Sequence, residues 1–252
     1  MRGKIKFFNL VLNDSDYIFS IEILLSVTAI FFGFNHQNVY TNHLYEVNTG
    51  LTGLSKTAFN GFFMSIASSI LYNMFIVIIL MAAYDTFIFG RAFDSNKLLV
   101  FNSLKFSKLD IYITYYLVFI ILTTIILFVF YFIAGFLIFL SFQLEIVITM
   151  FIYSIVFFMF CLSTGFFFIT TTKNSIVSII LIPLLFYIAI PSILLKPVNT
   201  YYFYFLEPPL GFSAFGNNMN SIYGLILDII ASALLISLSV YFSYFRDLKV
   251  VR

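Results

Sequence analysis

Long apolar stretches alternate with short polar ones along this chain. A helix needs about 20 mainly apolar residues to cross the hydrocarbon core of a bilayer, and six stretches approach or exceed that length. Because they are continuous rather than alternating, they predict spanning helices and not the strands of a membrane barrel. Gln143 and Glu145 divide the third stretch from the fourth. The predicted spans are residues 17–34, 61–84, 111–133, 146–170, 176–195 and 222–245.

Composition supports the same fold class. The 252 residues are 62% hydrophobic and only 10% charged, with a mean hydropathy of +1.06, whereas soluble domains are roughly 45–50% apolar and about 25% charged. A soluble enzyme, a nucleic-acid-binding protein and a disordered chain are therefore excluded, and a net charge of +2 indicates no polyanionic partner. The single cysteine, Cys161, excludes a disulfide framework and a zinc cluster. We expect an all-α integral membrane protein.

The basic residues predict the orientation. With the N-terminus in the cytoplasm, all but two of the 13 lysines and arginines fall in cytoplasmic segments, and only Lys56 and Lys196 lie outside. Cytoplasmic loops carry the excess of basic residues in membrane proteins. The sequence therefore predicts a multi-pass protein of the cell membrane with both termini in the cytoplasm.

Residues 1–16 precede the first span. Arg2, Lys6, Asn9 and Asn13 form one polar stripe at helical spacing, and apolar residues occupy most of the remaining arc. This pattern is typical of a helix lying in the membrane interface; the alternative is an ordinary basic flank.

Two connections are too long or too apolar for simple loops. Residues 85–110, predicted to be cytoplasmic, include the apolar Leu98, Leu99 and Phe101. They indicate a short helix parallel to the membrane that contacts a partner or the ends of the spans. The alternative is that this segment only lies among the lipid headgroups. Residues 196–221, predicted to be outside, are apolar on both sides of a break, because proline cannot continue a helix. They indicate two re-entrant half-helices, and the break comprises Glu207, Pro208, Pro209 and Gly211.

Polar residues within the spans are few. Glu22 lies near the cytoplasmic end of the first span and Asp228 near the outer end of the last, so we expect no direct pair between them. Each should face the bundle or a wet cavity, or reach an interface, because a charge facing lipid is costly. Asn73 in the second span is expected to bond another helix. The sequence contains no P-loop and no hydrolase motif. We therefore expect no catalytic residue, no metal site and no ATP site in this chain.

This layout resembles the membrane subunit of a type-2 ATP-binding-cassette (ABC) exporter. Such permeases have a surface helix, six spans with cytoplasmic termini, a coupling helix between the second and third spans, and re-entrant helices between the fifth and sixth. The local motif resembles that of the family in an acidic residue, a glycine, and the later dipeptides Ser103-Leu104 and Ser107-Lys108, which match in spacing. It departs from the family's motif at Lys105, which replaces a proline, and at Thr114-Tyr115, where Gly-Lys is common. The residues that match or flank this motif are Asp85, Gly90, Arg91, Leu98, Leu99, Phe101, Ser103, Leu104, Ser107 and Lys108.

The resemblance implies how such a chain would work. Two copies, or this chain and a similar permease, would pair in the membrane, and each would dock residues 85–110 onto one of two ABC ATPase subunits that bind ATP and magnesium. The cargo would be hydrophobic or amphipathic: a peptide, a lipid-linked molecule or a drug-like compound. Two alternatives stay open, a substrate-binding membrane subunit of an importer and a non-transport membrane assembly protein.

Overall fold

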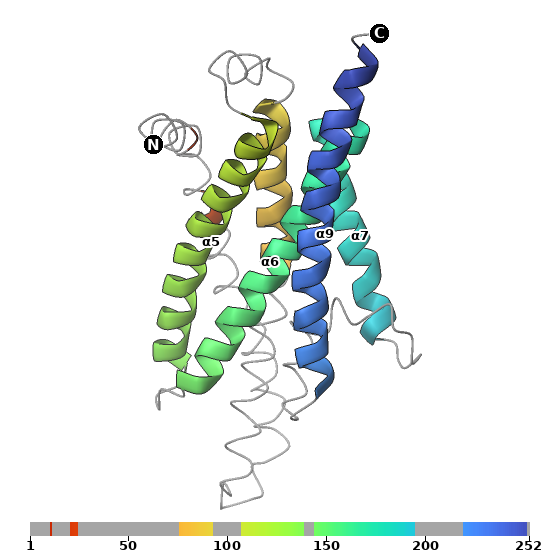
Figure 1. Ribbon diagram of the computed structural model, residues 1–252. Coiled ribbons are helices and arrows are strands. Elements are labelled where there is room, and N and C mark those ends of the chain that lie inside the picture. The colour runs from red at the N-terminus through yellow and green to blue at the C-terminus, as the bar shows by residue number, and fades with distance from the viewer. Residues whose placement is uncertain are drawn as a thin grey trace, which may run out of the picture.

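The computed structural model describes residues 11, 21–24, 76–92, 107–138, 144–194 and 219–250. Four long helices carry labels in Figure 1: α5 (Lys108–Ile138), α6 (Leu144–Thr172), α7 (Ser175–Leu194) and α9 (Met219–Val250). A further helix covers residues 76–92, and residues 21–24 are helical as well. The described part of the chain contains no strand, which confirms the predicted all-α fold class.

Local sequence explains where these helices begin and end. Ser107 caps α5, since its hydroxyl accepts a bond from the Asp110 N–H at 3.1 Å and donates to the Asp110 carboxylate at 2.7 Å; this Ser-x-x-acid pattern satisfies otherwise unbonded groups of the first turn. Helix α6 ends at Thr172, and the next residue, Lys173, has a left-handed φ of 57°. Asn174 then accepts the Ile176 N–H at 2.9 Å and caps α7.

Three helices are long and apolar enough to cross a membrane. They contain the segments Leu109–Phe132, Phe151–Thr172 and Gly224–Ser243. The apolar segment Ser175–Leu185 of α7 is shorter. On α5, a stripe of exposed large side chains recurs every three or four residues, as expected of a helix face in contact with lipid. This stripe comprises Ile113, Leu117, Ile121, Ile125, Phe128 and Phe132. The protein is therefore a membrane-embedded helical protein.

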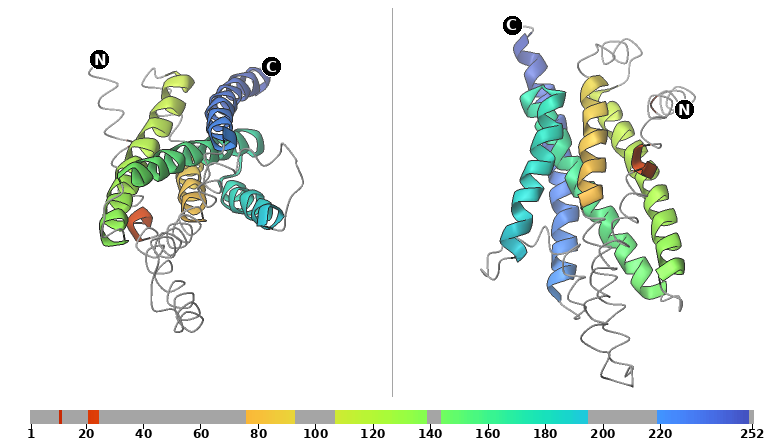
Figure 2. Two further views of the ribbon diagram at one scale, coloured as in Figure 1. Left: turned by 90° about the horizontal axis from the view of Figure 1, so that it is seen from below. Right: turned by 180° about the vertical axis from the view of Figure 1, so that it is seen from behind.

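Helix α6 is the centre of the described bundle. It contacts α5, α7 and α9, and 67% of its apolar segment is buried, against 39% for α5 and 22% for α9. Figure 2 shows α6 crossing between its neighbours, with helix 76–92 on the opposite side of α6 from α9. Any group on the buried face of α6 or of helix 76–92 is thus shielded from the surroundings by several helices.

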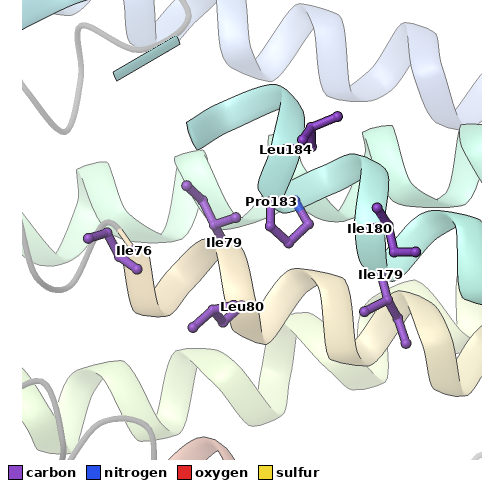
Figure 3. A pocket seen from close by; sticks show the side chains of 7 residues that line it. All are labelled: Ile76, Ile79, Leu80, Ile179, Ile180, Pro183 and Leu184. Atoms are coloured by element: carbon purple, nitrogen blue, oxygen red, sulfur yellow. The ribbon is translucent and has the colours of Figure 1, made fainter. Parts of the chain in front are cut away.

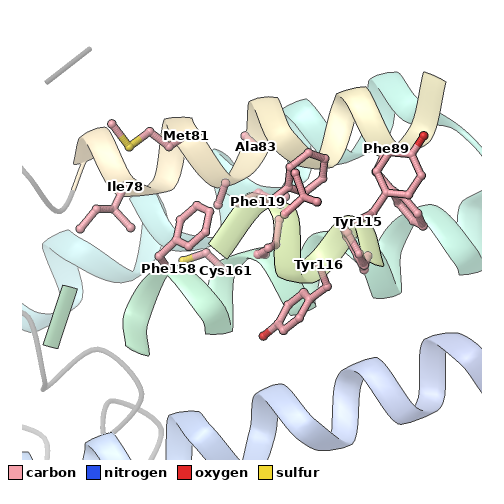
Figure 4. Close-up of a cluster of buried hydrophobic side chains, with 14 of the residues drawn as sticks. Ile78, Met81, Ala83, Phe89, Tyr115, Tyr116, Phe119, Phe158 and Cys161 are labelled. Atoms are coloured by element: carbon pink, nitrogen blue, oxygen red, sulfur yellow. The ribbon is translucent and has the colours of Figure 1, made fainter. Parts of the chain in front are cut away.

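A cluster of aromatic rings joins helix 76–92 to α5 and α6 (Figure 4). The Phe89 ring stacks on the Phe166 ring, with centroids 4.0 Å apart, and makes edge contacts with Tyr112 and Tyr115 at 5.1 and 5.3 Å. Phe119 adds an edge contact to Phe166. Aromatic pairs in these geometries stabilise beyond their buried area, so this cluster fixes one end of helix 76–92 against two spans.

Several predictions lie outside the described residues. They are the residues of the interfacial helix other than Val11, most of the first span, Asn73, residues 93–106 with Leu98, Leu99, Phe101, Ser103 and Leu104, and the outer loop with Glu207, Pro208, Pro209 and Gly211.

Candidate functional site

Among the residues that the structure describes, three carboxyl side chains are fully buried. Glu22, Asp85 and Asp228 are each 0% exposed. A charged side chain at the centre of a spanning helix costs about 2.5–3.5 kcal/mol by insertion measurements, and such residues therefore mark functional or helix-joining positions. Two of the three lie together, and we define Glu22 and Asp85 as the carboxyl pair.

The carboxyl pair connects three segments that are distant in the sequence. The Glu22 carboxyl group lies close enough to that of Asp85 for the two to interact electrostatically. On the α5 side, the Thr123 hydroxyl donates to Glu22 Oε1 at 2.8 Å, across 101 positions of the sequence. Neither carboxyl oxygen of Asp85 accepts a hydrogen bond from an N–H or O–H donor. Residues 21–24, helix 76–92 and α5 therefore meet at one buried polar contact.

The energetics of this contact restrict its charge. Two full charges about 4 Å apart interact with about 4 kcal/mol at an effective dielectric constant of 20, and the desolvation of each carboxylate adds to that repulsion. Two negative charges at this position would therefore oppose the packing of the three segments.

The neighbourhood of Asp85 is tightly packed. Thr86, the next residue, is 0% exposed and bonds back to the Ala82 carbonyl. A Cβ added to Gly165 of α6 would come within 2.6 Å of the Thr86 methyl group and of Ile182 Cδ1 of α7. One turn further along, Phe89 belongs to the aromatic cluster. The position of Asp85 is therefore set by contacts on three other helices.

Residues predicted from the coupling motif occupy different environments. Asp85 and Gly90 lie within helix 76–92, which continues past Tyr84 to residue 92, and Asp85 is buried. Arg91 is exposed, with its guanidinium 5.8 Å from the centre of the Phe87 ring. Ser107 is exposed and caps α5, and Lys108 is the first residue of α5.

Gly90 brings helix 76–92 against the connection between α6 and α7. A Cβ at this position would lie 2.6 Å from Ser175 Cβ, 2.9 Å from Ile169 Cδ1 and 3.0 Å from Ser175 Cα. Real Cβ atoms do not approach a backbone so closely, so only glycine permits this separation of the two segments. Helix 76–92 is thus held by Gly90 near one end and by the carboxyl pair one to two turns before it.

Asp228 lies elsewhere in the bundle. It is on α9, where its carbonyl accepts the Ser232 hydroxyl at 2.6 Å. Neither oxygen of its carboxyl group has a hydrogen-bond partner. No hydrogen bond therefore joins the Asp228 carboxyl group to Glu22.

Sequence reasoning singled out Glu22 and Asp85 separately and missed their contact. It placed Glu22 in a span and Asp85 at the start of a cytoplasmic connection, and it gave no role to Thr123. A threonine within an apolar span was the available signal, because its hydroxyl needs a partner in a water-free environment.

An apolar groove lies between helix 76–92 and α7 (Figure 3). Its volume is about 350 Å³, and its lining contains no ionisable side chain. Such a groove suits hydrocarbon and offers no group for catalysis. The lining residues are Ile76, Ile79, Leu80, Ile179, Ile180, Pro183 and Leu184.

Among the described residues, no group of three or more histidine, cysteine, aspartate or glutamate side chains could hold a metal ion. No protein-family model, curated protein or solved structure matches this chain. The fold and the buried polar contacts thus define a membrane-embedded, all-helical protein whose carboxyl pair is the most unusual feature of its described interior.

Proposed function

We propose that this chain is the transmembrane permease subunit of an ABC transporter, which exports a hydrophobic or amphipathic substrate with energy from a separate ATPase. Its layout of apolar helices, its few charges and its lack of a P-loop support this proposal. The protein would act in the cell membrane as a homodimer or as a heterodimer with a similar permease. It would have no ATPase activity of its own.

Helix 76–92 is the observation that carries the proposal. A subunit driven from the cytoplasm needs a stiff element that connects the docking segment to the spans. Helix 76–92 leads directly to residues 93–106, the greater part of the predicted coupling segment. Phe89 packs it against α5 and α6, and Gly90 places it in van der Waals contact with the α6–α7 connection. A displacement of the docking segment would therefore be passed to three other helices, because packed interiors are not continuously deformable.

The hydrophobic character of the cargo has separate support. The groove between helix 76–92 and α7 is lined by aliphatic side chains, and it lies beside the helix that would move. A hydrocarbon portion of an amphipathic molecule fits such a surface without losing hydrogen bonds to water. Cargo of this kind could reach the protein from the bilayer itself.

Purification from native membranes tests the proposal. The tagged full-length chain should copurify with an ABC ATPase subunit, recognised by its P-loop peptides in mass spectrometry. The variant Leu99→Asp, which places a charge on the predicted docking patch, should lose that ATPase while the permease stays in the membrane. Thr172→Asp is the matched control, since it puts the same charge at an exposed position at the end of α6.

Two outcomes would overturn the proposal. One is the absence of an ABC ATPase from the wild-type preparation after gentle cross-linking. The other is transport by the isolated chain in vesicles without nucleotide, because a subunit driven by ATP hydrolysis elsewhere cannot work alone.

A further inference from the structure

We propose that the surface between helix 76–92 and α7 binds an anionic phospholipid, with the phosphate between Arg91 and Lys173 and one acyl chain in the apolar groove. The proposed site is a lipid-binding site on the outside of the spans. It does not depend on the proposed transport function, because it follows from the position of two basic residues at the end of an apolar surface.

Packing of helix 76–92 brings these two basic residues to the same end of the bundle. A Cβ added to Gly90 would stand 3.0 Å from Ser175 Cα, so the two backbones are in contact. Arg91 directly follows Gly90, and Lys173 precedes Ser175 by two positions. Consecutive Cα atoms are about 3.8 Å apart, and both side chains are long. The guanidinium and the ammonium group can therefore reach one phosphate.

Both basic side chains are available to an anion. Arg91 and Lys173 are exposed, and neither forms an ion pair with another residue that the structure describes. The Arg91 guanidinium lies 5.8 Å from the centre of the Phe87 ring, an attraction that leaves its positive charge in place. Helix α7 begins at Ser175, and the partial positive charge of a helix N-terminus adds to the same field. Basic pockets between spanning helices bind anionic lipid headgroups in this way.

The two basic residues lie at the level where a bilayer has its phosphates. Lys173 directly follows Thr172, at which the apolar segment Phe151–Thr172 of α6 ends. From there, Leu184 is nine positions beyond Ser175 along α7, or about 14 Å at 1.5 Å per residue. This length is close to half of the ~30 Å hydrocarbon core, which is the depth of one leaflet. A single acyl chain below a phosphate spans that depth.

A continuous apolar track leads from this end into the groove. Ile176, Ile180 and Leu184 recur at every fourth position of α7 and therefore lie on one face of it. Each of the three is more than half exposed, so this face is open to the bilayer. Ile180 and Leu184 also line the groove, whose volume is about 350 Å³ and whose lining is apolar (Figure 3). The surface thus combines positive charge at one end with a hydrocarbon-lined channel, as an anionic phospholipid requires.

Tryptophan fluorescence of the full-length protein in vesicles tests the site, because the chain contains no tryptophan. Ile180→Trp places a single reporter at the groove, and Leu117→Trp places one on the exposed stripe of α5 as the matched control. Each is measured in phosphatidylcholine vesicles with the same small fraction of brominated phosphatidylglycerol or of brominated phosphatidylcholine, because bromine quenches a nearby tryptophan. The anionic lipid should quench Ile180→Trp more strongly than the zwitterionic one, and the two should quench Leu117→Trp equally.

Removal of the basic side chains provides the second arm. One basic residue near a membrane surface attracts anionic lipid by about fivefold in affinity. In the Ile180→Trp background, Arg91→Gln and Lys173→Gln should therefore each reduce the preference by about this factor, and both together should remove nearly all of it. Lys56→Gln combined with Lys196→Gln is the matched control, because it removes two charges from segments predicted to lie outside and should leave the preference in place.

Equal quenching of Ile180→Trp by the two lipids overturns the proposal, as does a preference that survives the loss of both Arg91 and Lys173. The same preference at Leu117→Trp would also refute it, because the anionic lipid would then gather around the whole protein. A second measurement covers a tryptophan variant that does not fold. In native mass spectrometry, the wild-type protein should retain phosphatidylglycerol over phosphatidylcholine of the same acyl chains, and the Arg91→Gln/Lys173→Gln variant should retain both alike. Equal retention by the wild type counts against the site.

Discussion

Gly165 on α6 lies directly against the Thr86 side chain of helix 76–92, so closely that an added Cβ would stand 2.6 Å from the Thr86 methyl carbon. Ile182 of α7 contacts the same point from the other side. Three helices therefore converge on a position that has room only for hydrogen. This contact fixes the separation of helix 76–92 from the central helix, next to the buried Asp85.

Gly165→Ala is expected to destabilise the protein by about 1–3 kcal/mol, the usual cost of extra volume in a packed interior. Removal of the opposing side chain by Thr86→Ala should restore part of the loss in the double variant, because the clash is with Thr86 as well as with Ile182. Denaturant unfolding in detergent micelles measures all three. Ser237→Ala, on an exposed part of α9, is the control and should change little. Equal stability of Gly165→Ala and the wild type would contradict the described packing.

A second interhelical contact joins α5 and α6 toward the other end of the bundle. The Tyr131 hydroxyl and the Ser154 hydroxyl are 2.5 Å apart, and both residues are buried. Hydrogen bonds between helices in membranes contribute about 0.6 kcal/mol on average and up to about 1.7. We expect Tyr131→Phe and Ser154→Ala each to lower the free energy of unfolding by an amount in this range. The double variant should lose less than the sum of the two, and strict additivity would show that the hydroxyls do not interact.

Lys173 ends α6 in a left-handed conformation, with a φ of 57° and its N–H bonded to the Ile169 carbonyl at 2.8 Å. A side chain in this region costs roughly 1–2 kcal/mol, and glycine avoids that cost. Lys173→Gly should therefore raise the stability by up to about 1 kcal/mol. Lys173→Ala removes the charge but keeps the strain, so it should bring no such gain. Equal stabilisation by alanine and by glycine would argue for charge repulsion instead, because both substitutions remove the charge.

The orientation of the protein in the membrane can be tested by cysteine labelling, with the wild-type protein as the unreactive control. Cys161 is 0% exposed, so the wild-type protein should not react with a membrane-impermeant maleimide. Arg91 is exposed at the end of helix 76–92, and Arg91→Cys should be labelled in inside-out vesicles and not in intact cells. Lys56→Cys, in a predicted outside loop, should show the reverse. Labelling of Arg91→Cys in intact cells would invert the predicted topology.

Hydropathy sufficed to locate the three long apolar helices of the described structure, because the bilayer imposes a simple length requirement. Helices α6 and α9 contain the apolar stretches predicted at residues 146–170 and 222–245. The start of α5 is indicated by Ser107 and Asp110, whose side chains form the hydrogen bonds of the first turn. These features depend on residues that are close in the sequence. Local patterns of this kind act before any tertiary contact is made.

Asp85 shows where such reasoning fails. A carboxyl group after an apolar run reads as the point where a helix leaves the membrane, yet helix 76–92 continues through it and buries it. The reason is a partner 63 positions earlier in the chain, Glu22, which is held in turn by Thr123. Hydropathy assigns each residue a value of its own, and it cannot register that two acidic side chains far apart in the sequence come close together inside the protein.

The amino-acid sequence alone established that this protein is helical and embedded in a membrane, because chain composition and the lengths of apolar runs respond to the solvent and not to other parts of the chain. Folding alone brought Glu22 to Asp85 and Gly165 to Thr86. Those contacts depend on how closely separate helices approach one another, and that distance is set by the shapes of side chains that meet only in three dimensions.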